Sequence, residues 1–464
     1  MESIEPATET VRARFDHLSN ADVTAAIAAA DAAFCSWRVV PMAERAIRMR
    51  LLATVLRDRK DRYARLITTE MGKPITEARA EIDKCALSCD HYAEHAATYL
   101  ADEVVESNAR ASYVAFEPLG VILAVMPWNY PFWQVIRFLA PALMAGNAAL
   151  LKHASNVPQC ALAIQEAVRD AGFPPDLMRT LLVSGAAIEP AIADDRVRAV
   201  TLTGSTDTGA RIAELAGRHV KKAVLELGGS DPFIVLRDAD VAAAAATATK
   251  ARFQNAGQSC IAAKRFLVEE PIAADFERRF AAAISALRVG DPLDPATDVG
   301  PLARGDLRET LERQVSESVR MGARVVVGGT KRRGTGWFYE PTLLADVTED
   351  MPVLREETFG PVAALLTVPD ADEAIRIANS SPYGLGAALW TADEEAARAL
   401  ARRIESGSVF INGMVASDPR LPFGGVKKSG YGRELSSFGI REFVNVQTIW
   451  IGPAAAQPTV ANAE

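Results

Sequence analysis

From residue 110 onward, short apolar runs alternate with stretches of helical periodicity, and this alternation limits the fold more than any other feature. The apolar runs are 121–126, 148–152, 180–183, 199–203 and 223–227, with helical patterns at 159–169 and 208–216. Strands that are separated by helices form parallel sheets with crossover connections. The pattern therefore predicts an α/β, doubly wound domain of the kind that binds nucleotides.

A second series of the same kind follows the Gly228-Gly229 pair. Its apolar runs are 233–236, 265–269, 323–327, 362–366 and 407–412, with a helix at 276–287. We therefore predict two doubly wound Rossmann-like domains, one formed by residues 1–101 and 120–229 and the other by residues 230–442. The first hundred residues are expected to be largely helical, with helices at 21–37, 43–58 and 77–100.

Two further segments alternate in hydrophobicity like edge strands. They are 111–116 and 444–450, and they lie within the segments 102–119 and 443–464. We predict that these two segments form a small β element that adds to the sheet of a partner chain. The residues after Pro453 are expected to be disordered.

Composition argues against several classes of protein. The chain of 464 residues has a formal net charge of −8 and no dense block of Lys and Arg, which argues against nucleic-acid binding. No apolar run is long enough to span a membrane, and the first residues lack the basic and apolar regions of a signal peptide. The five cysteines are scattered, so we expect no metal site, no disulfide framework and a cytoplasmic location.

Cys260 and Glu226 are the first candidates for chemistry. Cys260 ends the stretch 255–260 (NAGQSC), where a small backbone lets a substrate approach closely. Glu226 lies in an apolar Leu-Glu-Leu strand end, a setting that raises the pKa of a carboxylate and suits proton transfer. Together they provide the nucleophile and base of covalent catalysis. Taken singly, an inert buried thiol and a solvated carboxylate are the more ordinary interpretations.

Five segments in order along the chain make the prediction more specific. They are 126–132 (MPWNYPF), 225–229 (LELGG), 257–260 (GQSC), 356–361 (EETFGP) and 422–430 (PFGGVKKSG). In this order and at this spacing they resemble the aldehyde dehydrogenase superfamily over nearly the whole chain. The resemblance implies the fold of that family, with two Rossmann-like domains and a small β oligomerisation element, and it implies a homodimer or homotetramer.

The resemblance assigns three catalytic roles. Cys260 corresponds to the nucleophile that attacks the aldehyde carbon, and Glu226 to the base that activates the thiol or the hydrolytic water. Asn129 corresponds to the side-chain amide that forms an oxyanion hole with the backbone N–H of Cys260. Without the other motifs, a turn residue before Pro131 would be the better interpretation of Asn129.

A cofactor site is predicted from one turn and from the resemblance. Residues 203–205 (TGS) follow a strand and open a helix, where backbone N–H groups suit a pyrophosphate, although in isolation an ordinary capped turn is the better interpretation. The resemblance assigns cofactor binding to Trp128, Lys152, Ser155, Gly204, Ser205, Leu227, Glu357 and Phe359.

Ser155 favours NADP as the cofactor, with NAD as the alternative. NAD-preferring members of the family commonly carry Glu at this position, where it would repel a 2′-phosphate. Ser155 leaves room for that phosphate, and Lys152 can pair with it. His153, between these two residues, is expected on the surface at the end of its strand.

Three segments resemble a bacterial succinate semialdehyde dehydrogenase branch, namely 151–158, 227–233 and 262–265. This resemblance implies oxidation of succinate semialdehyde, with Arg137 holding the substrate carboxylate and Ser417 touching it. A salt-bridged helix residue is the alternative for Arg137. The related enzymes often carry a second Arg where this chain has Gln254, so selectivity for a carboxylate is expected to be weaker unless Arg420 contributes.

Other functions stay open at this stage. A broader dehydrogenase for glutarate semialdehyde or aliphatic aldehydes is the main alternative. Dehydrogenases that pass the acyl group to coenzyme A typically lack the Glu at position 226. A catalytically silent structural protein on the same fold is disfavoured because both Cys260 and Glu226 are present.

Overall fold

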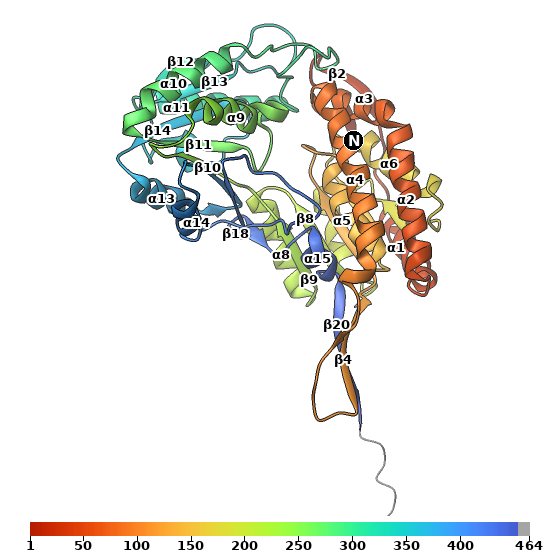
Figure 1. Cartoon of the computed structure of the whole chain (residues 1–464). Coiled ribbons are helices and arrows are strands. Elements are labelled where there is room, and N and C mark those ends of the chain that lie inside the picture. Colours follow the sequence, from red (N-terminus) through yellow and green to blue (C-terminus); the bar gives the residue numbers. More distant parts are fainter. Residues whose placement is uncertain (453–464) are drawn as a thin grey trace, which may run out of the picture.

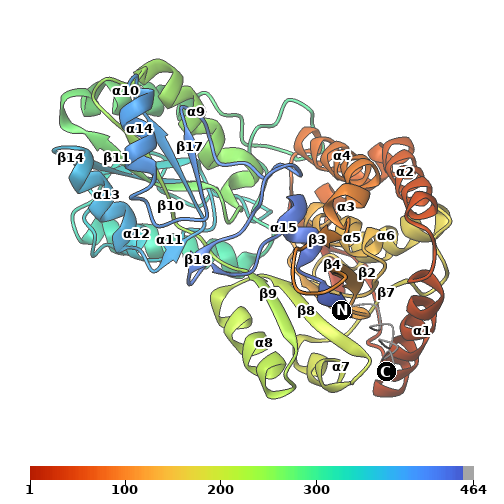
Figure 2. The same cartoon turned by 60° about the horizontal axis from the view of Figure 1, so that its bottom comes forward.

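The computed structural model describes residues 1–452 and shows two sheets, each covered by helices, with a narrow β arm projecting beyond them (Figure 1). Figure 2 shows the two helix-covered halves side by side, with α8 next to β9 at the edge of one and α9, α10 and α14 around the other. The predicted pair of doubly wound α/β units is therefore confirmed. Within residues 1–452, none of the helices combines the length and the apolar character needed to cross a membrane.

The first sheet has six strands in the order β19-β9-β8-β5-β6-β7. Its members are β5 (Val121–Met126), β6 (Ala148–His153), β7 (Met178–Thr180), β8 (Val197–Thr203), β9 (Lys222–Glu226) and β19 (Gly430–Tyr431). All pair in parallel except β19, which runs antiparallel to β9. Every residue of β5 is buried, because helices cover both faces of this sheet, and this explains its continuous apolar sequence.

Helices and an N-terminal hairpin surround this sheet. They are β1 (Glu2–Glu5), β2 (Thr10–Arg14), α1 (Asn20–Trp37), α2 (Met42–Asp58), α3 (Lys60–Met71), α4 (Ile75–Tyr99), α5 (Trp133–Met144), α6 (Pro158–Asp170), η1 (Gly185–Ile188), α7 (Glu189–Ala193) and α8 (Thr206–Arg218). The capping box of Ser19 and Asp22 begins α1. All twelve residues of α5 are buried, so this helix lies inside the molecule and carries Arg137 with it.

The second sheet has seven strands in the order β12-β13-β14-β11-β10-β16-β17. They are β10 (Asp231–Val235), β11 (Ala263–Glu269), β12 (Arg324–Val327), β13 (Thr342–Ala345), β14 (Val362–Val368), β16 (Gly386–Trp390) and β17 (Ser408–Ile411). The helices of this half are α9 (Val241–Phe253), η2 (Gln254–Gly257), α10 (Glu270–Ser285), α11 (Gly305–Arg320), α12 (Pro352–Arg355), α13 (Ala371–Ser380) and α14 (Glu394–Ala401). Only β12 is antiparallel to its neighbour within this sheet.

The remaining strands form two small sheets. β15 (Tyr383–Gly384) pairs with β18 (Val426–Lys427). The arm in Figure 1 consists of β20 (Val444–Ile451), β4 (Ala111–Pro118) and β3 (Glu103–Val104), in that order across the sheet. β20 and β4 are antiparallel over their whole length, from Val444 opposite Pro118 to Ile451 opposite Ala111. The two predicted edge strands are thus neighbours, whereas the expected disorder after Pro453 concerns residues outside those that the structure describes.

Several details differ from the sequence prediction. The run 180–183 falls mostly after β7, which ends at Thr180, and α3 was not predicted. His153 ends β6 as expected but is buried, with its Nε2 2.9 Å from the carbonyl oxygen of Pro131. The short strand β19 and the helix α15 (Ser436–Arg441) pack on the first half, although the predicted second domain runs to residue 442. The domain limits themselves stay a prediction.

A buried ion pair ties the start of α4 to α5. The ammonium of Lys73 pairs with the carboxylate of Glu81, and both side chains are inaccessible to solvent. The same carboxylate accepts hydrogen bonds from the backbone N–H groups of Phe132 (2.9 Å) and Trp133 (3.0 Å) at the beginning of α5. Glu81 therefore helps to place the helix that carries Arg137.

Replacing Lys73 by Met is expected to lower the free energy of unfolding by about 3–5 kcal/mol, because it leaves a buried carboxylate without its cation. The measurement is the midpoint of urea unfolding, followed by tryptophan fluorescence. Lys60→Met is the matched control, since Lys60 pairs with the exposed carboxylate of Asp83 at 3.1 Å and should cost less than about 1 kcal/mol. Equal losses in the two variants would contradict this interpretation.

Candidate active site

A left-handed turn places Cys260 between α9 and β11. Asn255, Ala256 and Gly257 have φ angles of 56°, 52° and 71° in succession, a conformation that costs about 1–2 kcal/mol for each non-glycine residue. A Cβ at Gly257 would overlap the carbonyl oxygen of Gly360, so only glycine fits there. The turn reverses the chain at the end of α9 and brings Cys260 to the start of β11.

Hydrogen bonds from the first half of the molecule hold this turn. The carboxylate of Glu77, on α4, accepts from the backbone N–H of Asn255 at 2.7 Å. The side-chain amide of Asn255 donates to the carbonyls of Asn129 (2.9 Å) and Gln258 (3.0 Å), and the amide of Asn129 also donates to Gln258 (3.1 Å). The predicted residue Asn129 therefore lies against the backbone that leads to Cys260.

A buried lysine supports the same backbone from the other side. The ammonium of Lys264 donates to the carbonyl oxygens of Ser259 at 3.0 Å and Cys260 at 2.8 Å. It also lies 3.4 Å from the carboxylate of Glu357. Cys260 is thus held by main-chain contacts, and its thiol is left free to face the cavities.

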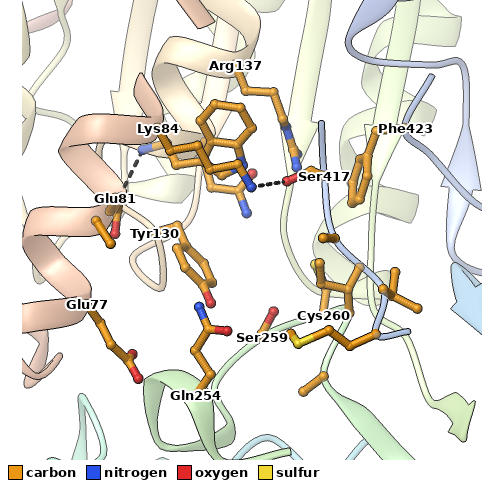
Figure 3. Close-up of a pocket in the computed structure, with 18 of the residues that line it drawn as sticks. Glu77, Glu81, Lys84, Tyr130, Arg137, Gln254, Ser259, Cys260, Ser417 and Phe423 are labelled. Atoms are coloured by element: carbon orange, nitrogen blue, oxygen red, sulfur yellow. Dashed lines mark hydrogen bonds between the residues drawn. The ribbon is translucent and has the colours of Figure 1, made fainter. Parts of the chain in front are cut away.

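Two cavities meet at Cys260, which lines both of them. The first, which we call the Arg137 cavity, has a volume of about 180 Å³ and lies among α4, α5, the Cys260 segment and residues 414–417 (Figure 3). The second, the Lys152 cavity, has a volume of about 430 Å³ and is lined by the ends of β5, β6, β8 and β9. A group that is bonded to the thiol can therefore be reached from two separate binding spaces.

Arg137 and Ser417 both line the Arg137 cavity, as does Gln254. Arg137 is already paired, because its Nε lies 2.5 Å from a carboxylate oxygen of Glu434. Its guanidinium also lies 4.6 Å from the centre of the Phe423 ring. Arg137 therefore lies in the cavity beside Cys260, as a residue that binds the substrate carboxylate would. It also forms a salt bridge, which was the alternative interpretation of this residue.

Arg420 does not contribute to this cavity. It forms a bidentate pair with Asp418 at 2.8 and 2.6 Å, and its side chain is 76% exposed. Ser417 instead accepts a hydrogen bond of 2.7 Å from the ammonium of Lys84, a residue of α4 that the sequence analysis did not identify. Nothing in the local sequence around Lys84 marks it, because its contact with Ser417 joins residues that are far apart in the chain.

The Lys152 cavity contains most of the predicted cofactor residues. Its lining includes Trp128, Lys152, Gly204, Ser205, Leu227, Glu357 and Phe359. The hydroxyl of Ser205 caps α8 by accepting from the N–H of Thr208 at 3.4 Å, so the N-terminus of α8 faces this cavity. Ser155 is exposed beyond the end of β6 and is not among the lining residues.

The donor set of the Lys152 cavity suits a dinucleotide. A helix N-terminus and a lysine without a carboxylate within 4 Å, among residues 1–452, favour phosphate groups. The carboxylate of Glu357 accepts from the N–H of Gly229 at 3.1 Å and has further lone pairs for ribose hydroxyls. The ring of Phe359 meets Trp128 edge to face at 5.6 Å and forms an aromatic wall.

Burial shifts the pKa values of the two candidate catalytic groups. Removal from water raises the pKa of Cys260 to about 12, although the positive charges of Arg137 and Lys264 oppose this. Burial also raises the pKa of Glu226 well above its usual value, and the nearby Glu434 raises it further. A thiol of this kind needs a base, and a carboxylate with a raised pKa is suited to accept its proton.

Glu226 is close to the site but does not line either cavity. It ends β9 immediately before Leu227 and Gly228, which line the Lys152 cavity. Both of its carboxylate oxygens are buried without a hydrogen-bond partner among residues 1–452. The carboxylate lies beside Gly424, where a Cβ would be 2.6 Å from its Oε1. No hydrogen bond within the described chain therefore fixes its orientation.

Within residues 1–452, no group of three or more His, Cys, Asp or Glu side chains is arranged to hold a metal ion. All five cysteines are free thiols, and Cys260 is the partly exposed one that lies in the cavities.

Comparison with known proteins agrees with this geometry. The family model described as the aldehyde dehydrogenase family matches residues 1–449. A probable NADP(+) succinate-semialdehyde dehydrogenase of Synechocystis is 53% identical over 450 residues, covering 97% of this chain and 99% of that one. NADP(+) succinate-semialdehyde dehydrogenase 1 of Mycobacterium tuberculosis is 51% identical over 453 residues, with the same coverage.

A solved structure extends the agreement to three dimensions. Succinic semialdehyde dehydrogenase from Streptococcus pyogenes, in complex with NADP+, superposes with a TM-score of 0.95 at 39% identity. The match covers 97% of this chain and 100% of the other. With the family model and the close relatives, this likeness shows that the chain belongs to the aldehyde dehydrogenase family.

Proposed function

We propose that this protein oxidises succinate semialdehyde to succinate with NADP as the hydride acceptor. The observation that carries the proposal is the position of Cys260 at the junction of two cavities, one suited to a small anion and the other to a dinucleotide. The relatives that carry this activity in their names are about half identical to the chain over nearly its full length, which supports the same substrate and cofactor.

The residues of the site divide the reaction between them. Glu226 accepts the thiol proton, and the sulfur of Cys260 bonds to the aldehyde carbon. The carbonyl oxygen becomes negative and accepts hydrogen bonds from the backbone N–H of Cys260 and from the amide of Asn129, which has a second N–H beyond the one donated to Gln258. The chemistry supplied by bound NADP is acceptance of a hydride from this carbon, which leaves a thioester on Cys260.

Hydrolysis of the thioester completes the reaction. Glu226 first loses the thiol proton to solvent. It then accepts a proton from the attacking water and passes it to the sulfur of Cys260 as the carbon–sulfur bond breaks, so that the carboxylic acid leaves and the thiol is restored. To act in both steps, the carboxylate has to turn from Gly424 toward the cavities. Because neither carboxylate oxygen has a hydrogen-bond partner within residues 1–452, this rotation breaks no hydrogen bond of the described chain.

We place the cofactor in the Lys152 cavity, with Lys152 and Ser155 beside the 2′-phosphate, Gly204 and Ser205 at the pyrophosphate, and Glu357 and Phe359 near the nicotinamide ribose. Trp128 and Leu227 complete the walls. In the Arg137 cavity, Ser417 donates a hydrogen bond to the substrate carboxylate, and the guanidinium of Arg137, which is shared with Glu434, borders the same end of the cavity.

We further propose that the arm joins copies of the chain into a homodimer or homotetramer. Among residues 1–452, β20 is the edge of its sheet, so one side of this eight-residue strand has no strand partner in the described part of the chain. Its side chains Val446 and Trp450 are 61% and 51% exposed.

A cytoplasmic location, which cell fractionation would test, suits the free thiols.

Cys260→Ala is expected to lower the rate of aldehyde oxidation by at least about a thousandfold, because no other thiol lines the cavities. Binding of NADP, measured by quenching of tryptophan fluorescence, should persist. Glu226→Gln should slow both the burst of NADPH and steady turnover, since activation of the thiol and hydrolysis lose the same base. Cys35→Ala, at an exposed thiol on α1, is the control with normal activity. Near-normal oxidation by the Cys260→Ala protein would refute the covalent route.

Ser155→Glu is expected to raise the KM for NADP by about tenfold or more, equivalent to ~1.4 kcal/mol, because a carboxylate would repel the 2′-phosphate. The KM for NAD should change little. Ser155→Gln provides a neutral side chain of the same size and should retain NADP preference. A wild-type enzyme that strongly prefers NAD in kcat/KM would contradict the assignment.

Trp450→Asp and Val446→Asp are expected to shift the protein toward monomers in sedimentation equilibrium, because each places a charge in the proposed interface. Val220→Asp is the control, since Val220 is 95% exposed and lies outside the arm. If both arm variants keep the mass of the wild-type oligomer, the arm is not the interface.

A further inference from the structure

We propose that Lys84, together with Ser417, recognises the carboxylate of the substrate and supplies the positive charge that selects it. This inference rests on the proposed function, since it concerns the substrate of the same site. It assigns the specificity to a residue of α4 that lies outside the Cys260 segment and outside the sequence motifs of the family.

Lys84 reaches the Arg137 cavity from the wall opposite the Cys260 segment. Its ammonium donates to the hydroxyl of Ser417 at 2.7 Å and lies 4.4 Å from the centre of the Trp133 ring. Figure 3 shows the ammonium, the Ser417 hydroxyl and Arg137 converging on one end of the cavity, with Glu77 and Gln254 at the other. The anion-binding groups are therefore gathered on one side.

The hydrogen bond between Lys84 and Ser417 leaves three donors for an anion, namely two N–H bonds of Lys84 and the O–H of Ser417. An ammonium group has three N–H bonds, of which Ser417 uses one. Because the Ser417 oxygen acts as the acceptor in this contact, its own O–H hydrogen points elsewhere and can be donated. A carboxylate has two oxygens, and one N–H together with one O–H can satisfy both of them.

Within residues 1–452, Lys84 is the cation of this cavity that has no carboxylate within 4 Å, whereas Glu77, which also has no ion-pair partner, lies at the other end. Arg137 pairs with Glu434, and Glu81 pairs with Lys73. No carboxylate of residues 1–452 lies within 4 Å of the Lys84 ammonium. Binding an anion at Arg137 requires competition with Glu434, whereas binding at Lys84 neutralises a cation that has no partner. The net positive charge of this end of the cavity thus comes from Lys84.

The surroundings of Lys84 make its charge sensitive to pH. Burial and the nearby Arg137 on α5 lower the pKa of Lys84 to about 8, opposed by Glu81 and Cys85 on α4 and by Asp418 in the segment after β17. Lys84 is positively charged below this pKa, and it loses its proton and its charge as the pH rises through that value. Discrimination in favour of a carboxylate should therefore be present at pH 7 and decline above about pH 8.

The test compares succinate semialdehyde with butanal, an aldehyde of the same carbon number without the carboxylate, at saturating NADP. For Lys84→Met we expect the KM for succinate semialdehyde to rise at least about tenfold, with changes of less than about threefold for butanal and for kcat. Lys84→Arg should recover most of the affinity because it restores the charge. Lys60→Met, which removes an exposed ammonium on α3, should behave like the wild type. Equal losses on the two aldehydes, or no loss on succinate semialdehyde, would overturn the inference.

A measurement on the unmodified enzyme makes the result independent of how well a variant folds. The ratio of kcat/KM for succinate semialdehyde to that for butanal should fall as the pH rises above about 8, while effects on Cys260 cancel in the ratio. In the Lys84→Arg enzyme the ratio should stay level over the same range. A wild-type ratio that is flat from pH 7 to about pH 10 would count against Lys84.

A binding experiment separates this inference from the proposed reaction. Succinate should slow alkylation of Cys260 by iodoacetamide, and Lys84→Met should require about tenfold more succinate for the same protection. If the wild-type enzyme does not favour succinate semialdehyde but protection still depends on Lys84, the proposed substrate fails and the anion site stands. If succinate gives no protection in the wild type, or protects both proteins equally, the role of Lys84 is refuted.

Discussion

The turn at Asn255–Gly257 joins the two halves of the molecule and sets the position of the thiol. Its backbone belongs to the second half, yet Glu77 of α4 and Asn129 after β5 provide the hydrogen bonds that hold it. Three successive left-handed residues are unfavourable for an isolated chain, so the turn exists only because these contacts outweigh the local cost. The two cavities can meet at Cys260 because this turn brings the chain back between the sheets.

Much of the fold and of the Lys152 cavity could be predicted from the sequence. Strands buried on both faces, such as β5, have continuous apolar sequences, and their order predicts the parallel sheets. The Lys152 cavity was also predictable, since Gly204, Ser205 and Leu227 follow strand ends that meet at one edge of a sheet. Local pattern was sufficient wherever the element that carries a residue also fixes its position.

The local sequence pattern did not predict the position of a side chain where that position depends on contacts between segments that are distant in the chain. Lys84 and Ser417 meet only after α4 has packed beside the segment that follows β17, and neither has a local signal for this. His153 seemed a surface residue because polar strand ends usually are, but the Pro131 carbonyl satisfies its ring nitrogen inside the protein. The pairing of Arg137 with Glu434 likewise joins two residues that are far apart in the sequence, so it could not be predicted from the local pattern around either of them.

Lys264 links the chemistry of the two cavities through one ammonium group. It donates to the carbonyl of Cys260 and lies 3.4 Å from Glu357, which lines the Lys152 cavity. Its positive charge lowers the pKa of Cys260, whereas the negative charge of Glu357 raises it. Hydrogen bonds that draw the Glu357 carboxylate toward a ligand would leave the charge of Lys264 less offset at the thiol. The pKa of the thiol therefore depends on the carboxylate that lines the larger cavity as well as on the lysine that supports its own backbone.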